Sequence, residues 1–184
     1  MRSFIFKFGA PAALVALLAS QSLPAAQAYA PLNCRWTSTN IIWTNASSLP
    51  YKTATTNAVA AWTSAVSVIT LSAVPPEYSY NIRAFDVNQG ANGYDGSTAY
   101  SCASGYFTGT VQSSFNTYYT DGYLAADAKK QVMVHEIGHA IGLDHAGTSS
   151  CSGQPIMYLK SDRFFTCGHV NPQADDIAGI NYIY

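Results

Sequence analysis

Three of the chain's four histidines and one of its two glutamates lie in a single stretch, VMVHEIGHAIGLDHAG, over residues 132–147. His135 and His139 are four residues apart, so on a helix their imidazoles project from one face, one turn apart. Two neutral ring nitrogens in that arrangement can bind one zinc ion. Glu136 points about 100° around the same helix, where its carboxylate can reach a metal-bound water without replacing it, as a general base must. The stretch therefore predicts either a hydrolytic metal site or a helix that carries imidazoles by chance.

The third histidine constrains the fold more tightly than the first two. Gly142 tolerates the left-handed conformation in which many helices end, so it predicts a turn directly after the helix. His145 then returns six residues after His139 and offers a third nitrogen. Three protein ligands leave the fourth position of a tetrahedral zinc ion open to water, which is the arrangement of a catalytic site. The chain must therefore fold as a helix, a glycine turn and a returning ligand.

The segment HEIGHAIGLDH, residues 135–145, resembles the metzincin signature HExxHxxGxxH. Further along, PIMY resembles the metzincin Met-turn, which implies that Met157 forms an apolar floor beneath the metal. The similarity extends to matrixins. The segment CRWTSTNIIWTNASSLPYKTATTNAVAAWTSAVSVITLSAV resembles their opening strand, helix and strand, and PQADDIAGINYIY resembles their last helix. The resemblance covers residues 34–184.

This resemblance implies an α+β metzincin fold. Such a fold has a twisted mixed sheet with two long helices, a zinc cleft, and a small C-terminal subdomain that follows Gly142 and contains a final helix. The paired aspartates Asp175 and Asp176 would hold the fold together by anchoring the N-terminus and the Met-turn region. A protein or peptide substrate would bind extended along an edge strand, for which VQSSFN near Val111 to Asn116 is the candidate.

The implied function is a secreted zinc-dependent metalloendopeptidase. A zinc-bound water would hydrolyse the peptide bond, with zinc held by His135, His139 and His145 and the water activated by Glu136 as the general base. One catalytic zinc ion is expected. A second, structural zinc is not, because that site of the family uses three further histidines and only His169 lies outside the motif. The sequence offers no support for a structural calcium ion.

Two other functions fit the same residues. A secreted binding or toxin module would keep zinc for structure and would lack peptidase activity, although a structural site has no need of Glu136. A zinc amidase that acts on cell-wall peptides would share the chemistry and differ in its substrate. Protein digestion with and without a chelator separates the first from a peptidase, and a substrate panel separates the second.

Residues 1–28 are predicted to be a signal peptide, followed by one matrixin-like catalytic domain over residues 29–184. Arg2 and Lys7 precede the short apolar run APAALVALLA, and AQA at residues 26–28 fits signal-peptidase cleavage. Without those two cations, seven basic residues remain against ten acidic ones. Nucleic-acid and membrane-surface binders show clustered Lys and Arg, so neither class is expected. We expect an extracellular or periplasmic monomer with no membrane anchor.

The four cysteines predict two disulfide bonds, because an exported chain with an even number of cysteines usually pairs them. Of the three pairings that four cysteines allow, we favour Cys151–Cys167, a local loop after the histidines, together with Cys34–Cys102, which would tie the N-terminus to the middle of the chain. No CxxC spacing supports a cysteine metal site.

Periodicity predicts the secondary structure. Alternation of apolar and polar residues predicts strands over 40–43, 69–74 and 80–87, and a partly polar strand at a sheet edge over 111–119. Helical spacing predicts helices over 53–66, 125–141 and 171–184, the last of them capped by Asn171. Residues 88–109, which are rich in Gly, Ser, Asn and Tyr, are predicted to form a long surface loop.

Overall fold

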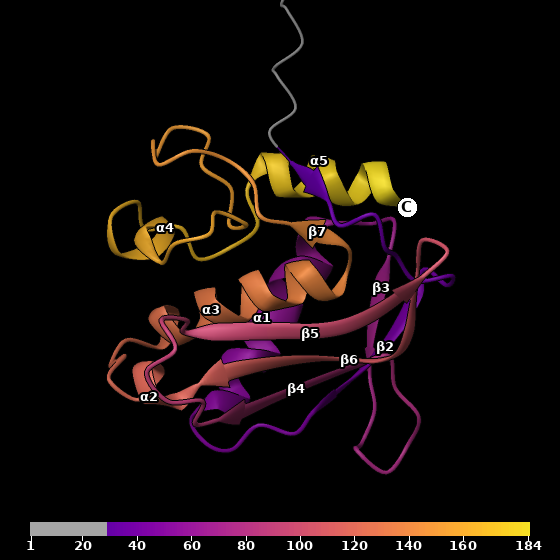
Figure 1. Ribbon diagram of the computed structural model, residues 1–184, viewed down its shortest axis with the longest axis horizontal. Helices are drawn as coiled ribbons and strands as arrows, with labels where there is room; N and C mark the ends of the chain where they lie inside the picture. The colour runs from indigo at the N-terminus through magenta and orange to yellow at the C-terminus, as the bar shows by residue number, and fades with distance from the viewer. Residues whose placement is uncertain (1–28) are drawn as a thin grey trace, which may run out of the picture.

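A five-stranded mixed sheet is the centre of the fold in the computed structural model, which describes residues 29–184 (Figure 1). In spatial order its strands are β3 (Thr70–Ala73), β2 (Asn40–Asn45), β4 (Ile82–Val87), β6 (Tyr106–Asn116) and β5 (Gly96–Ala103). The first four run parallel, and β5 pairs antiparallel with β6. This confirms the mixed α+β fold and the first three predicted strands. The predicted signal peptide lies outside the described residues.

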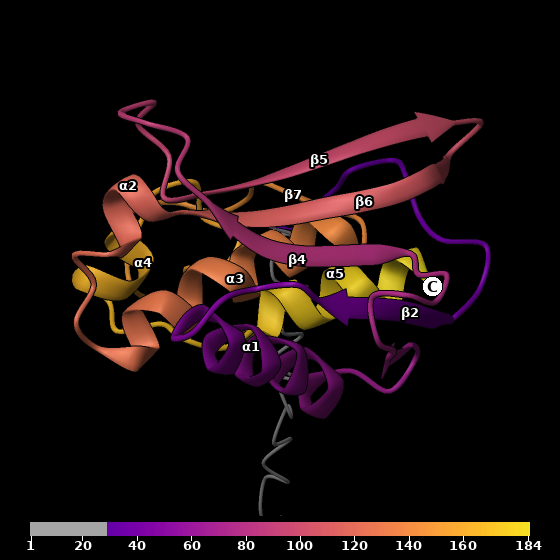
Figure 2. The ribbon, with the colours of Figure 1, turned by 90° about the horizontal axis from the view of Figure 1, so that it is seen from below.

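Two long helices, α1 (Tyr51–Ala65) and α3 (Ala126–Ala140), pack against one face of this sheet (Figure 2). The structure thus confirms the helices predicted over 53–66 and 125–141. The remaining helices are α2 (Thr117–Thr120), α4 (Asp162–Phe165) and α5 (Ala174–Ile183). Among the described residues, no helix is long and apolar enough to cross a membrane.

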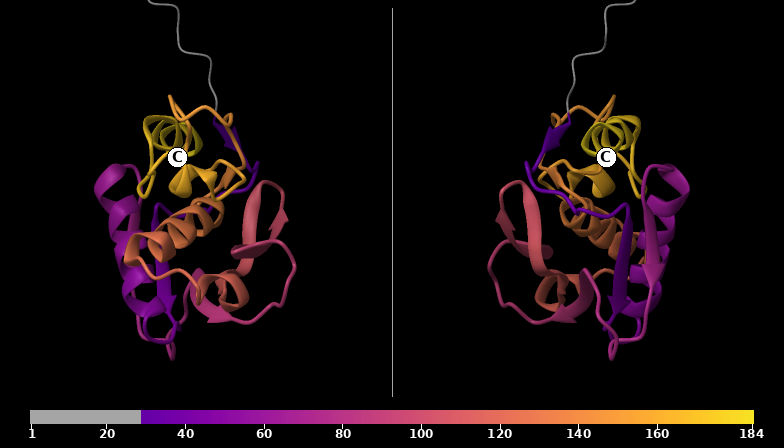
Figure 3. Two further views of the ribbon diagram at one scale, coloured as in Figure 1. Left: turned by 90° about the vertical axis from the view of Figure 1, so that its left-hand side faces the viewer. Right: turned by 90° about the vertical axis from the view of Figure 1, so that its right-hand side faces the viewer.

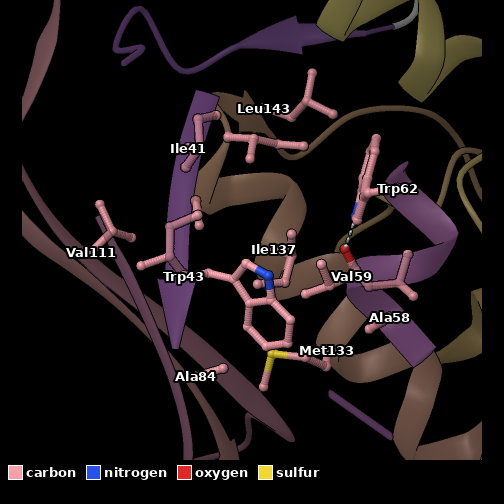
Figure 4. Close-up of a cluster of buried hydrophobic side chains, with 14 of the residues drawn as sticks. Ile41, Trp43, Ala58, Val59, Trp62, Ala84, Val111, Met133, Ile137 and Leu143 are labelled. Carbon is pink, nitrogen blue, oxygen red and sulfur yellow. Dashed lines mark hydrogen bonds between the residues drawn. The ribbon is translucent and has the colours of Figure 1, made fainter. Parts of the chain in front are cut away.

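The hydrophobic core lies between the sheet and the two long helices (Figure 4). Alternate strand residues such as Ile41 and Val111 point toward the helices and are fully buried, as a strand with one covered face requires. Trp62 of α1 is buried among them, and its Nε1 donates a hydrogen bond of 2.8 Å to the carbonyl of Val134 in α3. The core therefore joins α1 directly to the helix that carries the predicted metal ligands.

A small C-terminal part follows α3 and packs on the side of this helix opposite to β4, β5 and β6 (Figures 1 and 3). The chain first forms β7 (Leu143–Asp144), which pairs antiparallel with β1 (Ala30–Pro31) near the N-terminus. It then runs through a long irregular segment with α4 to reach α5. The helix α3 thus lies between the two parts and contacts both.

The free edge of the sheet nearest α3 is β5, and this corrects two predictions. The sequence predicts an edge strand near Val111 to Asn116, but that segment belongs to β6, which pairs with β4 on one side and with β5 on the other. The predicted loop over 88–109 contains the whole of β5. Only Gly96 of β5 is buried, so the strand lacks the apolar alternation by which a sequence indicates a strand.

The final helix forms, but it begins later than predicted. Gln173 is the N-cap of α5, and the carboxylate of Asp176 accepts a hydrogen bond of 2.7 Å from the backbone N–H of Gln173. The prediction of Asn171 as the cap is wrong because this capping box satisfies the free N–H groups of the first turn reciprocally. Asn171 instead accepts a hydrogen bond of 2.7 Å from Lys130 of α3.

Both favoured disulfide bonds are present. Cys34–Cys102 joins the segment before β2 to the end of β5, across a sequence separation of 68 residues. Cys151–Cys167 closes a loop of the C-terminal part, across a separation of 16 residues. No cysteine in the described part of the chain is free.

We expect the longer disulfide loop to contribute more to stability, because a crosslink removes more chain entropy from the unfolded state when its loop is longer. Replacing both Cys34 and Cys102 with serine should lower the free energy of unfolding by about 4 kcal/mol, and the matched Cys151→Ser, Cys167→Ser pair should lower it by about 3 kcal/mol. Urea unfolding of the purified variants measures both values. A larger loss for the shorter loop would contradict this account.

Candidate metal centre

Three imidazoles converge at the end of α3. His135 and His139 lie one turn apart on the helix, and His145 follows β7. Each Nε2 atom is 3.2 Å from the other two. Three nitrogens that bind one tetrahedral zinc ion at about 2.0–2.1 Å are separated by nearly this distance. Among residues 29–184 this is the one group of three or more His, Cys, Asp or Glu side chains placed to hold a metal ion. The fourth histidine, His169, lies apart, with its Nε2 3.3 Å from the carbonyl of Cys151.

Backbone carbonyls orient two of the rings. The Nδ1 atom of His135 is 2.8 Å from the carbonyl of Ile156, and the Nδ1 atom of His139 is 2.7 Å from the carbonyl of Leu143. Because a carbonyl only accepts hydrogen bonds, each Nδ1 must carry the proton and donate it. The lone pair of each neutral ring is therefore on Nε2, which faces the other two imidazoles.

Burial, which is nearly complete for His135 and only partial for His139 and His145, favours the neutral form of the imidazoles. It lowers the pKa of His135 well below its ordinary value, lowers the pKa of His139 to about 4, and lowers the pKa of His145 as well. The positive charge of Arg163 lowers the pKa of each ring further. A neutral imidazole is the form that binds a metal ion. The chemistry and spacing of these donors therefore fit zinc near neutral pH.

The turn that returns His145 to the cluster depends on Gly142. Its φ is +107°, a conformation that L side chains rarely adopt. A Cβ atom at this position would lie 2.8 Å from the carbonyl oxygen of Cys34. The N–H of Leu32 donates a hydrogen bond of 2.8 Å to the carbonyl of Gly142, so the N-terminal segment fills the space beside the turn. Gly142 is thus required both for its backbone conformation and for this close approach.

Glu136 lies beside the imidazoles and is almost completely buried, with 4% of its surface exposed. Thr98 of β5 donates a hydrogen bond of 2.8 Å from its hydroxyl to Oε2 of the carboxylate. Burial raises the pKa of Glu136 to about 8, although the hydrogen bond from Thr98 and the charge of Arg163 oppose this shift. The edge strand therefore holds one carboxylate oxygen in place beside the cluster.

Met157 lies against the turn of α3 that carries the first two histidines. Its sulfur contacts the position that a Cβ atom would take on Gly138, so only a glycine leaves room for it. Asp176 of α5 fixes this segment, because its carboxylate accepts hydrogen bonds from the N–H of Ile156 at 2.8 Å and of Met157 at 3.2 Å. Burial raises the pKa of Asp176 to about 6. The carbonyl of Ile156 orients the His135 ring. Asp176 of α5 therefore helps to position this ring by holding the backbone at Ile156 and Met157.

The three imidazoles and Glu136 line a cavity of about 310 Å³ between α3, β5 and the segment that contains α4. Thr98 and Arg163 line it too, and the sequence analysis identified neither. Nothing in the sequence distinguishes Thr98, because the polar strand around it resembles a loop. The sequence around Arg163 gives only a weak indication that this residue is buried: two phenylalanines follow the arginine, in a chain with only 10% charged residues.

We expect Gly142→Ala to weaken zinc binding, because the added Cβ atom would displace either the turn or Cys34 and so move His145. The affinity of the metal-free protein for zinc, measured by competition with a chromophoric chelator, should fall at least about 10-fold, the effect expected from local strain of about 1–3 kcal/mol. Gly153→Ala is the matched control, because Gly153 also has a positive φ of 73° but nothing lies within 4 Å of its added Cβ. An unchanged affinity in Gly142→Ala would contradict the role of the turn.

The chain is similar in sequence or in structure to several known proteins. A curated relative, a matrix-metalloproteinase-like protein of Spodoptera frugiperda ascovirus 1a, is 40% identical over 76 residues, which are 41% of this chain and 19% of the viral protein. One solved structure of myroilysin is 20% identical, with a TM-score of 0.42, over 60% of this chain and 52% of that one. Another is 16% identical, with a TM-score of 0.41, over 84% and 78%.

The chain spans only about a fifth of the viral relative's length, so that relative bears on the matched segment alone. The family model described as Matrixin, from the M10 peptidases, matches residues 35–184. This match includes the whole sheet, the cluster of three imidazoles and the segment around Met157. The chain therefore belongs to the matrixin family.

Proposed function

We propose that the protein is an exported zinc-dependent endopeptidase that hydrolyses peptide bonds with Glu136 as the general base. One observation carries the proposal: three neutral imidazoles with their Nε2 atoms 3.2 Å apart share a cavity with a buried carboxylate. A structural metal site would have no need of a carboxylate that is placed beside the ligands without joining them. Membership of the matrixin family supports the same reading.

His135, His139 and His145 would hold the zinc ion that the family implies. When bound, zinc supplies Lewis-acid chemistry, by which it lowers the pKa of a water and polarises the substrate carbonyl. The lowered pKa values favour the neutral form of the three rings, and the carbonyls of Ile156 and Leu143 orient two of them toward one point. Three protein ligands would leave one coordination position of the ion for water or substrate.

Glu136 would move the proton. Its carboxylate takes a proton from the attacking water as the water adds to the scissile carbonyl, and later gives that proton to the leaving amine. The hydrogen bond from Thr98 engages Oε2, so Oε1 is the oxygen that we assign to proton transfer.

The substrate would bind extended along β5. Among residues 29–184 this strand pairs only with β6, so its other edge offers backbone N–H and C=O groups to a further strand. Gly96, Ser97 and Thr98 of β5 line the cavity together with the imidazoles. An extended peptide that pairs with this edge would place a peptide bond beside Glu136. The sequence predicts this role for Val111 to Asn116, and we transfer it to β5 because β5 is the edge strand.

Export is supported by the pattern of residues 1–28 and by the two disulfide bonds, which persist in oxidising compartments. Of the alternatives, a zinc-containing binding module leaves the position of Glu136 unexplained. A zinc amidase specific for cell-wall peptides would use the same residues, and a comparison of protein and cell-wall substrates separates it from a general endopeptidase.

We expect Glu136→Gln to lower kcat/KM by about 10²–10⁴-fold, the usual contribution of a general base, while the protein still binds one zinc ion. Peptide hydrolysis and metal analysis of the purified variant measure the two properties. Glu77→Gln is the matched control, because Glu77 is the chain's only other glutamate and is exposed in a loop. Near-normal hydrolysis by a zinc-loaded Glu136→Gln variant would exclude the proposed role of Glu136.

Removal of the metal should abolish activity reversibly. Casein digestion should stop when a chelator strips the protein and should return when zinc is added back, because the three convergent imidazoles would supply the protein ligands of the ion. Cleavage that survives complete removal of the metal would rule out zinc catalysis. A fully zinc-loaded protein that cleaves no protein or peptide would favour the binding module instead.

A further inference from the structure

Arg163 is a buried cation at the wall of the cavity. It lies in α4, and only 1% of its surface is exposed. Its backbone is held on both sides, since its N–H donates to the carbonyl of Lys160 at 3.3 Å and its carbonyl accepts from the N–H of His169 at 2.7 Å. The side chain is therefore fixed by its surroundings, in the manner of a preorganised binding group.

The guanidinium makes fewer hydrogen bonds than it can. Its Nη1 atom donates to the carbonyl of Tyr158 at 3.1 Å, but its Nε and Nη2 atoms are buried and have no hydrogen-bond partner among the described residues. Burial lowers the pKa of Arg163, yet a guanidinium stays charged in proteins. A buried charge with unsatisfied donors is costly, so this arrangement is explained best by a partner that arrives from outside.

The nearby carboxylates do not provide that partner. Asp95 and Glu136 are the acidic groups that act on Arg163 most strongly. Asp95, however, accepts hydrogen bonds from Tyr123 and Ser161, and Glu136 accepts one from Thr98. The two carboxylates reduce the electrostatic cost of the buried cation without hydrogen-bonding to Nε or Nη2.

The position of Arg163 connects it to substrate. It lines the same cavity of about 310 Å³ as His135, Glu136 and the edge strand β5. A peptide that crosses the cluster along β5 would therefore pass the part of the cavity wall that Arg163 forms.

We propose that Arg163 determines specificity by binding the carboxylate of an aspartate or glutamate side chain that flanks the scissile bond. Adjacent Nε–H and Nη2–H groups form a donor fork that matches the two oxygens of a carboxylate. The preferred substrates are then acidic at that position. This inference rests on the proposed peptidase function, and it names the class of substrate for the same site.

The test uses the zinc-loaded protein and fluorogenic peptides that differ only in Glu, Gln or Lys at each residue flanking the cleaved bond. Wild-type kcat/KM should favour Glu over its neutral isostere Gln by about 10-fold or more at one of the two positions, as a charge-assisted bidentate pair predicts. Arg163→Gln should reduce this ratio to within about 3-fold of unity. Arg163→Lys should keep part of it, because an ammonium retains the charge but loses the fork.

The control is Arg83→Gln, which removes an arginine on β4 whose guanidinium lies over Phe85; it should leave the Glu-to-Gln ratio unchanged. If Arg163 serves only to balance the charges of Asp95 and Glu136, Arg163→Gln will slow all peptides equally and keep the ratio, and the proposal is then wrong. If the variants do not fold, the wild type decides alone: equal or better cleavage of the Gln peptides at both positions overturns the proposal.

A binding measurement separates this proposal from the proposed activity. Calorimetry with zinc-loaded Glu136→Gln should show at least about 10-fold tighter binding of the Glu peptide than of the Gln peptide. Preferential binding by the variant, together with a zinc-loaded wild type that cleaves none of the peptides, would overturn the peptidase function and support the carboxylate site. Cleavage without any preference in rate or affinity would support the peptidase and overturn the role of Arg163.

Discussion

At Gly142 the backbone leaves α3 with a φ of +107°, and the convergence of three imidazoles depends on this reversal. On a continued helix His145 would point about 240° around the axis from His139, because each residue adds about 100°. The N-terminal segment supports the turn from outside, since Trp36 donates a hydrogen bond of 2.9 Å from Nε1 to the carbonyl of Ala140 at the end of α3. The Cys34–Cys102 bond then ties this segment to the edge strand β5.

The site is shared between the two parts of the molecule. The sheet and α1 hold α3 through the core, whereas the C-terminal part supplies the carbonyl that orients His135 and the sulfur that packs on Gly138. The carboxylate of Asp176 fixes both of these contacts from α5. The orientation of His135 on α3 therefore depends on the packing of the C-terminal part. A small segment with little regular structure thus contributes directly to the geometry of the three imidazoles.

The sequence predicts the helices and strands whose apolar residues are regularly spaced, and it predicts the cluster of three histidines from the HExxHxxGxxH motif. The helices α1 and α3 and the parallel strands bury alternate or helically spaced apolar residues, and the histidine spacing indicates the centre directly. It does not predict β5, because only Gly96 of this strand is buried and pairing with β6 holds the rest. It also misses Thr98 and Arg163, whose roles arise from tertiary contacts between segments far apart in the chain. The sequence also does not predict the cap of α5, which is a capping box: the side chains of Gln173 and Asp176 each accept a hydrogen bond from the backbone N–H of the other residue.

The central claim is that His135, His139 and His145 bind one zinc ion and leave one coordination position open. X-ray absorption at the zinc edge of the protein loaded with one equivalent of zinc tests this most directly. The account predicts three imidazole nitrogens at about 2.0–2.1 Å and one further light ligand from solvent, with no sulfur. A zinc–sulfur distance of about 2.3 Å, or a shell in which four protein side chains close the site, would contradict it.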